Sequence, residues 1–525
     1  MGLPIVLALF GLALGVGAMP LVGHLVEIPS WAPMMASMVG LGVGIDYALL
    51  LVTRHRENLA SGMSVAAAAG HAVATAGRSV VFAGGTVLVS ILGLSVAGIP
   101  FLTAAGIAIA VVVLVMVSAS VTLLPALLGL AGHRINRLSV RRRGPAAVAA
   151  SGRWERWATH VTRHARPYLI GATVFLLAIA APVLALRLGV PDDGTLPESR
   201  TERRAYDLVA AGFGPGANGP LVVAVDIARD GGVVEPIRRA IAADPGIASV
   251  AAASVDPDAG VASIIVIPTG SPQDQATQAT VDRLRARVLP AALGRSRATA
   301  YVGGQTAAFG DMSGRVEERL PVFIAAVVVL SMLLLMFVFR SILVPLKAAL
   351  LNLLGVGAAY GVLVMVFQWG WGASLIGLES TVPIVSFIPM FMFAIVFGLS
   401  MDYEVFLLSR IREHYLASAD NDAAVVRGLA STARVITSAA LIMVSVFLGF
   451  VAGNDPTTKM FGLGLATAIF VDATIIRLIL VPAAMALMGD ANWWLPRWLD
   501  RALPGGHHPR PTREIGDPAS AGQVR

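Results

Sequence analysis

The sequence predicts a polytopic α-helical membrane protein with two pseudo-repeated helical half-bundles, about ten transmembrane helices and one extracytoplasmic α+β domain. Three observations predict this fold class. Of the 525 residues, 56% are hydrophobic and 14% are charged, which lies outside the range of soluble globular proteins. Ten apolar runs are long enough to cross a bilayer as helices. One motif also recurs at a fixed interval, which indicates two homologous halves.

The apolar runs divide the chain into segments. We expect a first transmembrane half with four spans at 1–130, a basic cytoplasmic linker at 131–166, a span at 167–188, the extracytoplasmic domain at 189–319, a second half with five spans at 320–490 and a cytoplasmic tail at 491–525. The spans themselves are expected near residues 4–26, 31–53, 79–97, 101–130, 167–187, 320–339, 343–367, 385–409, 435–453 and 460–488.

The repeated motif is an Asp-Tyr pair inside an apolar run. Asp402-Tyr403 follows Asp46-Tyr47 by 356 residues, and Arg412 follows Arg56 by the same interval. An ionised carboxylate at the depth of the hydrocarbon costs roughly 3 kcal/mol or more, so it is rarely there without a function. We therefore expect each half-bundle to contribute one buried Asp-Tyr pair.

The two pairs can form a proton relay if Asp46 and Asp402 meet between the half-bundles. The hydroxyl groups of Tyr47 and Tyr403 can then each bond the opposite aspartate. Burial disfavours the charged form of a carboxyl group, so these groups are expected to bind and release protons near neutral pH. Such a relay would let the half-bundles shift, as alternating access requires. The alternative is a static polar contact between helices, and the duplication in register favours the relay.

A second set of polar residues also lies within the expected spans. Asp472 and Arg477 are five residues apart in the last span, and Ser400 precedes Asp402 by two residues. A relay role is possible for all three. For Asp472 and Arg477, a structural ion pair, or an Arg477 side chain that reaches the inner membrane surface, is favoured over it.

Basic residues set the expected orientation. With a cytoplasmic N-terminus, the inner segments hold 23 lysines and arginines, whereas the outer loops between spans hold only Lys459. This imbalance predicts that both termini are cytoplasmic. The nine arginines within 131–166 resemble a nucleic-acid patch in isolation, but a cytoplasmic linker that anchors the topology is favoured. The same linker contains His160 and His164, at metal-ligand spacing. Since no third ligand is evident, a solvated helix face is favoured there.

Residues 189–319 have the composition of a soluble domain. We expect strands at 221–226 and 262–267, helices at 234–243 and 273–292, and turns at 213–220 and 302–305. The glycine-rich turn at 213–220 precedes a strand and lacks a Lys-Ser/Thr pair, which argues against nucleotide binding. The alternation of strands and helices predicts a small α+β domain.

No motif of enzymatic or metal chemistry is evident. The chain has no HExxH, no Walker A lysine and no GxSxG between a strand and a helix, and it contains no cysteine. We therefore expect neither an enzyme nor an ATP-driven pump, and no cofactor or metal. Any transport would be driven by an ion gradient.

At this point the sequence resembles a known family. Gly44-Ile45-Asp46-Tyr47, the run from Gly398 to Glu413, and Phe470-Val471-Asp472-Ala473-Thr474 with Arg477 and Pro482 look like the signature helices of MMPL transporters (mycobacterial membrane protein, large). These belong to the resistance-nodulation-division superfamily. The resemblance covers residues 1 to about 490. It implies export of lipids or other hydrophobic molecules across the bacterial inner membrane, driven by the proton motive force, with the aspartates and tyrosines as the proton path. It also implies a porter-like outer domain.

The sequence departs from the family pattern at its start. Members of the family have twelve spans and two outer domains, one after the first span of each half. Aligning Leu3-Pro4 with Val344-Pro345 leaves no first-half counterpart for the spans at 167–187 and 320–339 or for the domain between them. We therefore expect an N-terminally truncated member. The alternatives are a non-transporting membrane remnant or accessory protein and a drug-efflux relative; a homo-oligomer is compatible with each.

Overall fold

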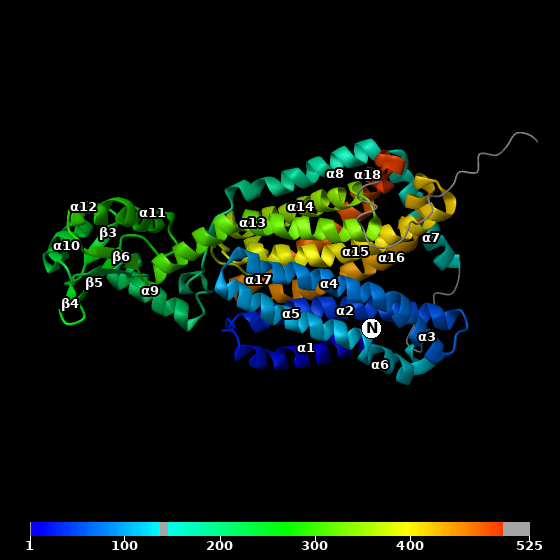
Figure 1. The fold of residues 1–525 in the computed structure, drawn as a ribbon, viewed down its shortest axis with the longest axis horizontal. Helices are drawn as coiled ribbons and strands as arrows, with labels where there is room; N and C mark the ends of the chain where they lie inside the picture. Colours follow the sequence, from blue (N-terminus) through cyan, green and yellow to red (C-terminus); the bar gives the residue numbers. More distant parts are fainter. Residues whose placement is uncertain (1, 137–144, 497–525) are drawn as a thin grey trace, which may run out of the picture.

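The molecule consists of a long helical bundle with a small sheet domain at one end (Figure 1). The computed structural model describes residues 2–136 and 145–496. Within these residues ten helices are long and apolar enough to cross a membrane, and a five-stranded sheet forms the core of the small domain. The predicted fold class is therefore confirmed. The basic run Arg141-Arg142-Arg143 and the expected tail beyond residue 496 lie outside the described residues.

The first half-bundle is formed by four of the ten long helices. Two of these, at Val65–Ala97 and Pro100–Ala131, are made of several consecutive helical segments. Its elements are α1 (Gly2–Gly23), α2 (Ala32–Ala60), α3 (Val65–Ala72), the π-helix η1 (Val73–Gly77), α4 (Arg78–Leu92), the 3-10 helix η2 (Gly93–Ala97), α5 (Pro100–Val121), α6 (Leu123–Ala131) and the 3-10 helix η3 (Gly132–Asn136). Helix α2 is longer than the run expected at 31–53. Apolarity marks only the part of a helix that suits hydrocarbon, whereas the backbone hydrogen bonds continue into its polar end.

The remaining membrane helices form the second part of the bundle. They are α8 (Ala165–Ala180) with η4 (Ala181–Ala185), α13 (Gln305–Phe339), α14 (Leu343–Leu363) with the π-helix η9 (Val364–Gln368), α15 (Ile388–Ser418), α16 (Asn421–Val451) and α17 (Pro456–Val471), which continues through the π-helix η11 (Asp472–Leu480) into α18 (Val481–Met488) and η12 (Gly489–Trp493). The short 3-10 helix η10 (Ala373–Ile376) lies in the loop before α15.

The helices that carry the repeated motif occupy the centre of the bundle. Helices α2 and α15 are the two most deeply buried of the ten, whereas α8 lies at the edge (Figure 1). Contacts between the halves are made by α4 against α15 and by α16 against α2. Because these crossings are related by the repeat, both Asp-Tyr pairs face the interior of the bundle and not the lipid.

The expected linker at 131–166 includes a helix that packs on the bundle. Its second part forms helix α7 (Pro145–Arg163), which packs against α16 and α18. The indole Nε1 of Trp157 donates a hydrogen bond to the carbonyl oxygen of Leu478 at 3.1 Å. A proline suits the first turn of a helix, because its missing N–H has no partner there in any case. The second part of the expected linker thus packs as a helix against the bundle.

The small domain is one antiparallel sheet with helices packed on it. Its strand order is β3-β5-β2-β6, and β4 also pairs with β5. Its buried core joins β2, β3, β5 and β6 to α10, α11 and the segment that follows α11. The elements are β2 (Leu221–Asp226), β3 (Ile247–Val250), β4 (Ser254–Asp256), β5 (Val261–Pro268), β6 (Thr299–Gly303), α9 (Thr201–Phe213), α10 (Val234–Ala242), α11 (Gln275–Arg283), the π-helix η8 (Leu284–Val288), α12 (Leu289–Leu293) and the short 3-10 helices η5 (Asp193–Thr195), η6 (Pro215–Asn218) and η7 (Gly231–Val233).

Most of the predicted elements of this domain are present, and one boundary is wrong. The turn expected at 302–305 is narrower than predicted, because Val302 and Gly303 belong to β6 and Gln305 begins α13. The reversal is confined to Gly304, whose φ of +94° is a conformation that favours glycine. Sequence patterns also missed α9, β3, β4 and β6.

Two connections join the small domain to the bundle. One is α13, which begins inside the domain and continues as a single helix to the far end of the bundle (Figure 1). The other is a parallel pairing of β1 (Leu188–Gly189) with β7 (Ile384–Val385), just before α15. Ser386 links the two, because its hydroxyl donates to the carbonyl oxygen of Gly189 at 2.9 Å and lies 2.6 Å from the hydroxyl of Ser313 on α13. The helix that carries Asp402 is therefore tied to the domain just before its first turn.

Candidate functional site

The two Asp-Tyr pairs meet at the centre of the bundle. The hydroxyl of Tyr47 donates to Oδ2 of Asp402 at 3.2 Å, and the hydroxyl of Tyr403 donates to Oδ1 of Asp46. Asp46 is 4% exposed, and both tyrosines are buried. Each tyrosine thus bonds the aspartate of the other half-bundle, as the repeat led us to expect.

Repeat-related glycines allow the helices to approach this closely. A Cβ atom on Gly398 of α15 would lie 2.8 Å from the Cα of Val87 on α4. A Cβ atom on Gly42, which precedes Gly398 by 356 residues, would lie 2.8 Å from the ring tip of Phe447 on α16. Both distances are shorter than real Cβ contacts, so a side chain at either position would force the half-bundles apart.

The two aspartates do not have equal surroundings. Asp402 also accepts a hydrogen bond at 2.9 Å from the hydroxyl of Thr86 on α4. The position 356 residues after Thr86 is Ile442, which has no hydroxyl to offer Asp46. Sequence reasoning did not identify Thr86, although the repeat register placed it on the helix that faces α15.

The second set of predicted residues forms a buried network beside the pairs. Arg477 donates from Nε to Asp472 at 2.8 Å and from Nη2 to the carbonyl oxygen of Ser400. The Ser400 hydroxyl lies 2.7 Å from Oδ1 of Asn352 and 2.8 Å from Oδ1 of Asp472. Arg477 is fully buried, so the expectation that it could reach the membrane surface is wrong, whereas the ion pair with Asp472 is present.

The backbone explains why a five-residue spacing works here. Asp472 and Arg477 lie in the π-helix η11, in which backbone hydrogen bonds run from i to i+5. A wider turn brings residues five apart close to one face. In a regular α-helix, residues five apart are less well aligned, because one turn takes 3.6 residues.

Two further charged side chains join this network. Nζ of Lys347 lies 3.6 Å from Oε1 of Glu404, and Nη1 of Arg477 lies 4.0 Å from Oε2 of Glu404. Glu404 is fully buried and Lys347 is 7% exposed. Lys347 is one of the 23 basic residues counted in the inner segments, although it lies within the span expected at 343–367. Glu404 stood in the motif beside Tyr403 without a role.

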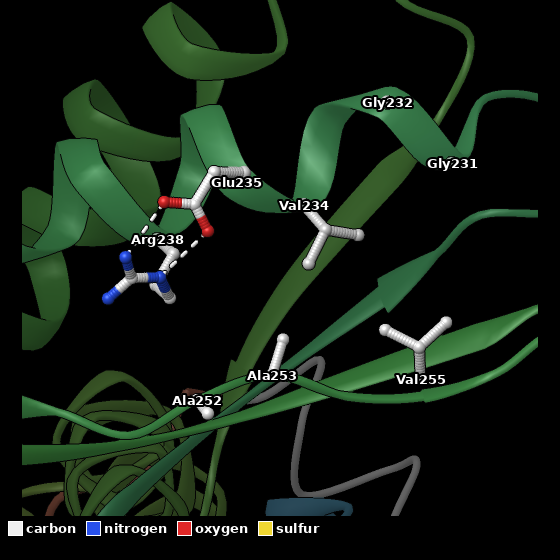
Figure 2. Close-up of a pocket in the computed structure, with 8 residues that line it drawn as sticks. All are labelled: Gly231, Gly232, Val234, Glu235, Arg238, Ala252, Ala253 and Val255. Carbon is white, nitrogen blue, oxygen red and sulfur yellow. Dashed lines mark hydrogen bonds and ion pairs between the residues drawn. The ribbon is translucent and has the colours of Figure 1, made fainter.

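Other candidate sites are less developed. An open groove of about 640 Å³ on the small domain is lined by Glu235, Arg238, Val255 and small residues (Figure 2). Its two charged side chains bond each other at 2.7 and 2.9 Å, which leaves neither directed at a ligand. The rings of His160 and His164 have their centres 4.6 Å apart and their planes tilted by 40°, and both side chains are exposed. In residues 2–136 and 145–496, no three histidine or acidic side chains are placed to hold a metal ion.

The fold and this centre define a multi-pass helical membrane protein with an acidic pair at the interface of two repeated half-bundles, in which Asp46 is buried and Asp402 is half-buried. The family model of the MMPL family matches residues 1–168 and 222–513. The chain therefore belongs to the MMPL family, as the motifs indicated, and it is a cell-membrane protein.

Three relatives show the range of proteins that this chain resembles. It is 37% identical over 507 residues to "Membrane protein YdfJ" of Bacillus subtilis, covering 96% of this chain and 69% of that protein. It is 36% identical over 525 residues to "Mycolic acid-containing lipids exporter MmpL11" of Mycolicibacterium smegmatis, covering 98% and 54%. It is 36% identical over 491 residues to "Heme uptake protein MmpL11" of Mycobacterium tuberculosis, covering 91% and 50%. The chain thus spans about half the length of the two mycobacterial relatives.

Proposed function

We propose that this chain takes part in proton-driven movement of a lipid or other hydrophobic molecule across the cell membrane, with both termini in the cytoplasm. Asp46, Tyr47, Asp402 and Tyr403 are the proposed proton path. The observation that carries the proposal is the reciprocal bonding of the two Asp-Tyr pairs across the interface of the half-bundles.

The physical argument concerns the cost of charge at this depth. Two ionised aspartates in a buried centre repel each other and lose their hydration, and protonation relieves both costs. Because each aspartate is held by the tyrosine of the other half, a change in its charge alters the contact between the halves. Such a contact can couple proton binding to a rigid-body shift of one half against the other.

The substrate class rests on the relatives. One is named as a lipid exporter and another as a heme uptake protein, and both names describe large molecules with apolar parts. We favour a lipid, because export of lipids or other hydrophobic molecules is what the resemblance of the motifs to the MMPL family implies. Heme is the second candidate and is supported only by the name of that relative.

The test compares envelope lipids in a strain that lacks the gene and in strains that express the full chain or a variant. We expect a lipid to accumulate in the deletion strain, the unaltered chain to restore its export, and Asp402→Asn to fail. Glu413→Gln is the matched control, because Glu413 is an exposed acid at the end of the same helix. Export by the Asp402→Asn strain at the control level would contradict the proton path. Heme-dependent growth that requires the chain, without lipid accumulation, would favour the second candidate.

A further inference from the structure

We infer that Lys347, Glu404 and Arg477 enclose a hydrated proton-transfer site, separate from the Asp-Tyr centre, in which Glu404 is a third carboxyl group that exchanges protons. The inference deepens the proposed function and rests on it. It starts from atoms of the bundle interior that the Asp-Tyr centre does not use.

Five buried polar atoms on three helices have no hydrogen-bond partner in the described part of the chain. They are Nζ of Lys347, Oε1 and Oε2 of Glu404, Nη1 of Arg477 and Nδ2 of Asn352. Leaving a buried polar group without a partner costs about 1–3 kcal/mol, and more when it is charged. A set of five at one place is therefore expected to have partners other than protein.

Water is the partner that fits these atoms. The ammonium and guanidinium groups can only donate hydrogen bonds, ionised carboxylate oxygens can only accept them, and water does both. The 3.6 Å between Lys347 and Glu404 is long for a direct hydrogen bond and suits a bridging water. Two cations, Lys347 and Arg477, face two carboxyl groups, Glu404 and Asp472, so the ionised cluster has no net charge that would require an additional ion.

Polar groups lead from this cluster to the Asp-Tyr centre. The guanidinium carbon of Arg477 lies 5.6 Å from the ring centre of Tyr403, whose hydroxyl bonds Asp46. A small cavity of about 10 Å³ is lined by Ser400, Tyr403, Asp472 and apolar side chains of α15, α16 and α17. The space is close in size to one water molecule, and its lining is mostly apolar apart from these three side chains. Glu404 is thus connected through Arg477 and Asp472 to the side of Tyr403.

The cluster also lies between the centre and one end of the bundle. Helix α13 leaves the small domain and ends at Phe339, so α14 begins at the opposite end, at Leu343 (Figure 1). Lys347 is four residues into α14, or about 6 Å from that end at 1.5 Å per residue. A proton that travels between the centre and the end away from the domain would therefore pass this site.

The transfer that the site permits keeps its total charge constant. A proton leaves the ammonium group of Lys347, crosses the bridging water and binds the carboxylate of Glu404. The products are a neutral amine and a neutral carboxylic acid, and no charge is created in the low-dielectric interior. Arg477 remains protonated in both states and holds Asp472, and the hydroxyl of Tyr403 stays bonded to Asp46.

The competing explanation is a static cluster of buried ion pairs. Removing one partner of such a pair is destabilising, but removing both together is often neutral. The double variant Lys347→Met/Glu404→Gln distinguishes the two. A static cluster predicts that the double variant regains activity that each single variant loses. A proton-transfer site predicts that the double variant folds and remains defective.

The first measurement is infrared spectroscopy of the purified full chain in H₂O and D₂O, in which an exchangeable carboxylic acid shifts its C=O band. We expect Glu404→Gln to remove one carboxylic-acid C=O band and Asp402→Asn to remove a different one. Loss of a band in Asp402→Asn but not in Glu404→Gln would overturn this inference and leave the proposed function intact. If Asp402→Asn removed no band, the proposed proton path itself would fail.

The second measurement is proton flux into liposomes that contain the full chain and the pH dye pyranine. We expect the double variant to slow proton entry by roughly 100-fold, the scale of a lost proton-transfer group. Glu413→Gln should leave the rate unchanged. A double variant that conducts protons at the control rate would show that the cluster is structural only.

Discussion

The two half-bundles share the Asp-Tyr motif but differ in what surrounds it. Beside the pair of the second half lie Asn352, Ser400 and Asp472, which bond one another. The corresponding positions of the first half are Gly44 and Met116, at the interval of 356 residues, and Gly11, at the interval of 341 residues that aligns Leu3 with Val344. A Cβ atom on either glycine would lie within 3 Å of the Met116 sulfur, at 2.6 and 2.9 Å, so these three residues also meet. The same place in the fold is a polar network in one half and an apolar contact in the other.

A single extra residue accompanies this difference. Pro482 follows Asp472 by ten positions, whereas Pro125 follows Met116 by nine. The extra residue falls within the π-helix η11, and π-turns inside helices are frequent at functional sites. The carboxyl pair is therefore duplicated, whereas its ionic surroundings are not. Only the second half holds a buried arginine, lysine and glutamate in the described residues of the bundle centre.

The largest effect is expected from Arg477→Met. This change leaves the buried carboxyl group of Asp472 without its cation, which costs about 3–5 kcal/mol for a buried pair. Asp472→Met gives this position its first-half residue, and the double variant should recover most of the loss. The measurement is the midpoint of thermal unfolding in detergent. A double variant as unstable as Arg477→Met would contradict the account of this network.

The next effect compares Gly398→Ala with Gly42→Ala. An added methyl group at Gly398 meets the backbone of Val87, whereas one at Gly42 meets the tip of the Phe447 ring. Overpacking costs about 1–3 kcal/mol, and backbone yields less than a side chain. We therefore expect Gly398→Ala to lower the unfolding midpoint more. Phe447→Leu should restore Gly42→Ala and leave Gly398→Ala unchanged; equal effects of the two alanine variants would refute this.

A smaller effect is expected from Gly44→Ala. Its added methyl group meets the sulfur of Met116, which is the end of a flexible side chain. We expect a loss of about 1 kcal/mol or less. Met116→Val in the same chain should remove it, because the shorter side chain frees the space. Additive losses from the two changes in a double-mutant cycle would show that the residues are not in contact.

The smallest effect is expected in the small domain and not in the bundle. Arg283 donates to Asp244 at 2.7 Å, and this contact lowers the pKa of that carboxyl group below its usual range. A carboxyl group with a lowered pKa stabilises the fold above the pKa of the unfolded chain, about pH 4, and this stability is lost as the pH falls further. Hydrogen exchange of the full chain should show β3 losing protection below about pH 4. Asp244→Asn should abolish that pH dependence; if the variant shows the same acid profile, the pair is not its cause.

Much of the centre could be predicted from the sequence, because a repeat with a fixed interval restricts where the equivalent helices can lie. Helices related by the same interval pack in related ways, so the repeat placed Tyr47 near Asp402 and Tyr403 near Asp46. The ten spans followed from the length and apolarity of their runs. The family also followed from the motifs.

The remaining residues could not be predicted because their signals had simpler explanations. Lys347 lies near a helix start, where a lysine usually anchors a helix at the membrane surface. Asn352 and Thr86 are single polar residues in apolar helices, and such residues often bond their own backbone. Asp472 and Arg477 lie close together because of the π-helix, and no sequence pattern predicts a π-helix. In the small domain, β3 and β4 have four and three residues, too few for a reliable alternation.

The central claim is that Asp46 and Asp402 exchange protons as one unit while they face each other. It is tested most directly by pH-driven proton flux in liposomes for Asp46→Asn, Asp402→Asn and the double variant of the full chain. Residues that act as a unit are non-additive, so each single change should abolish flux as completely as both together. Substantial flux in either single variant, with further loss in the double, would contradict the claim.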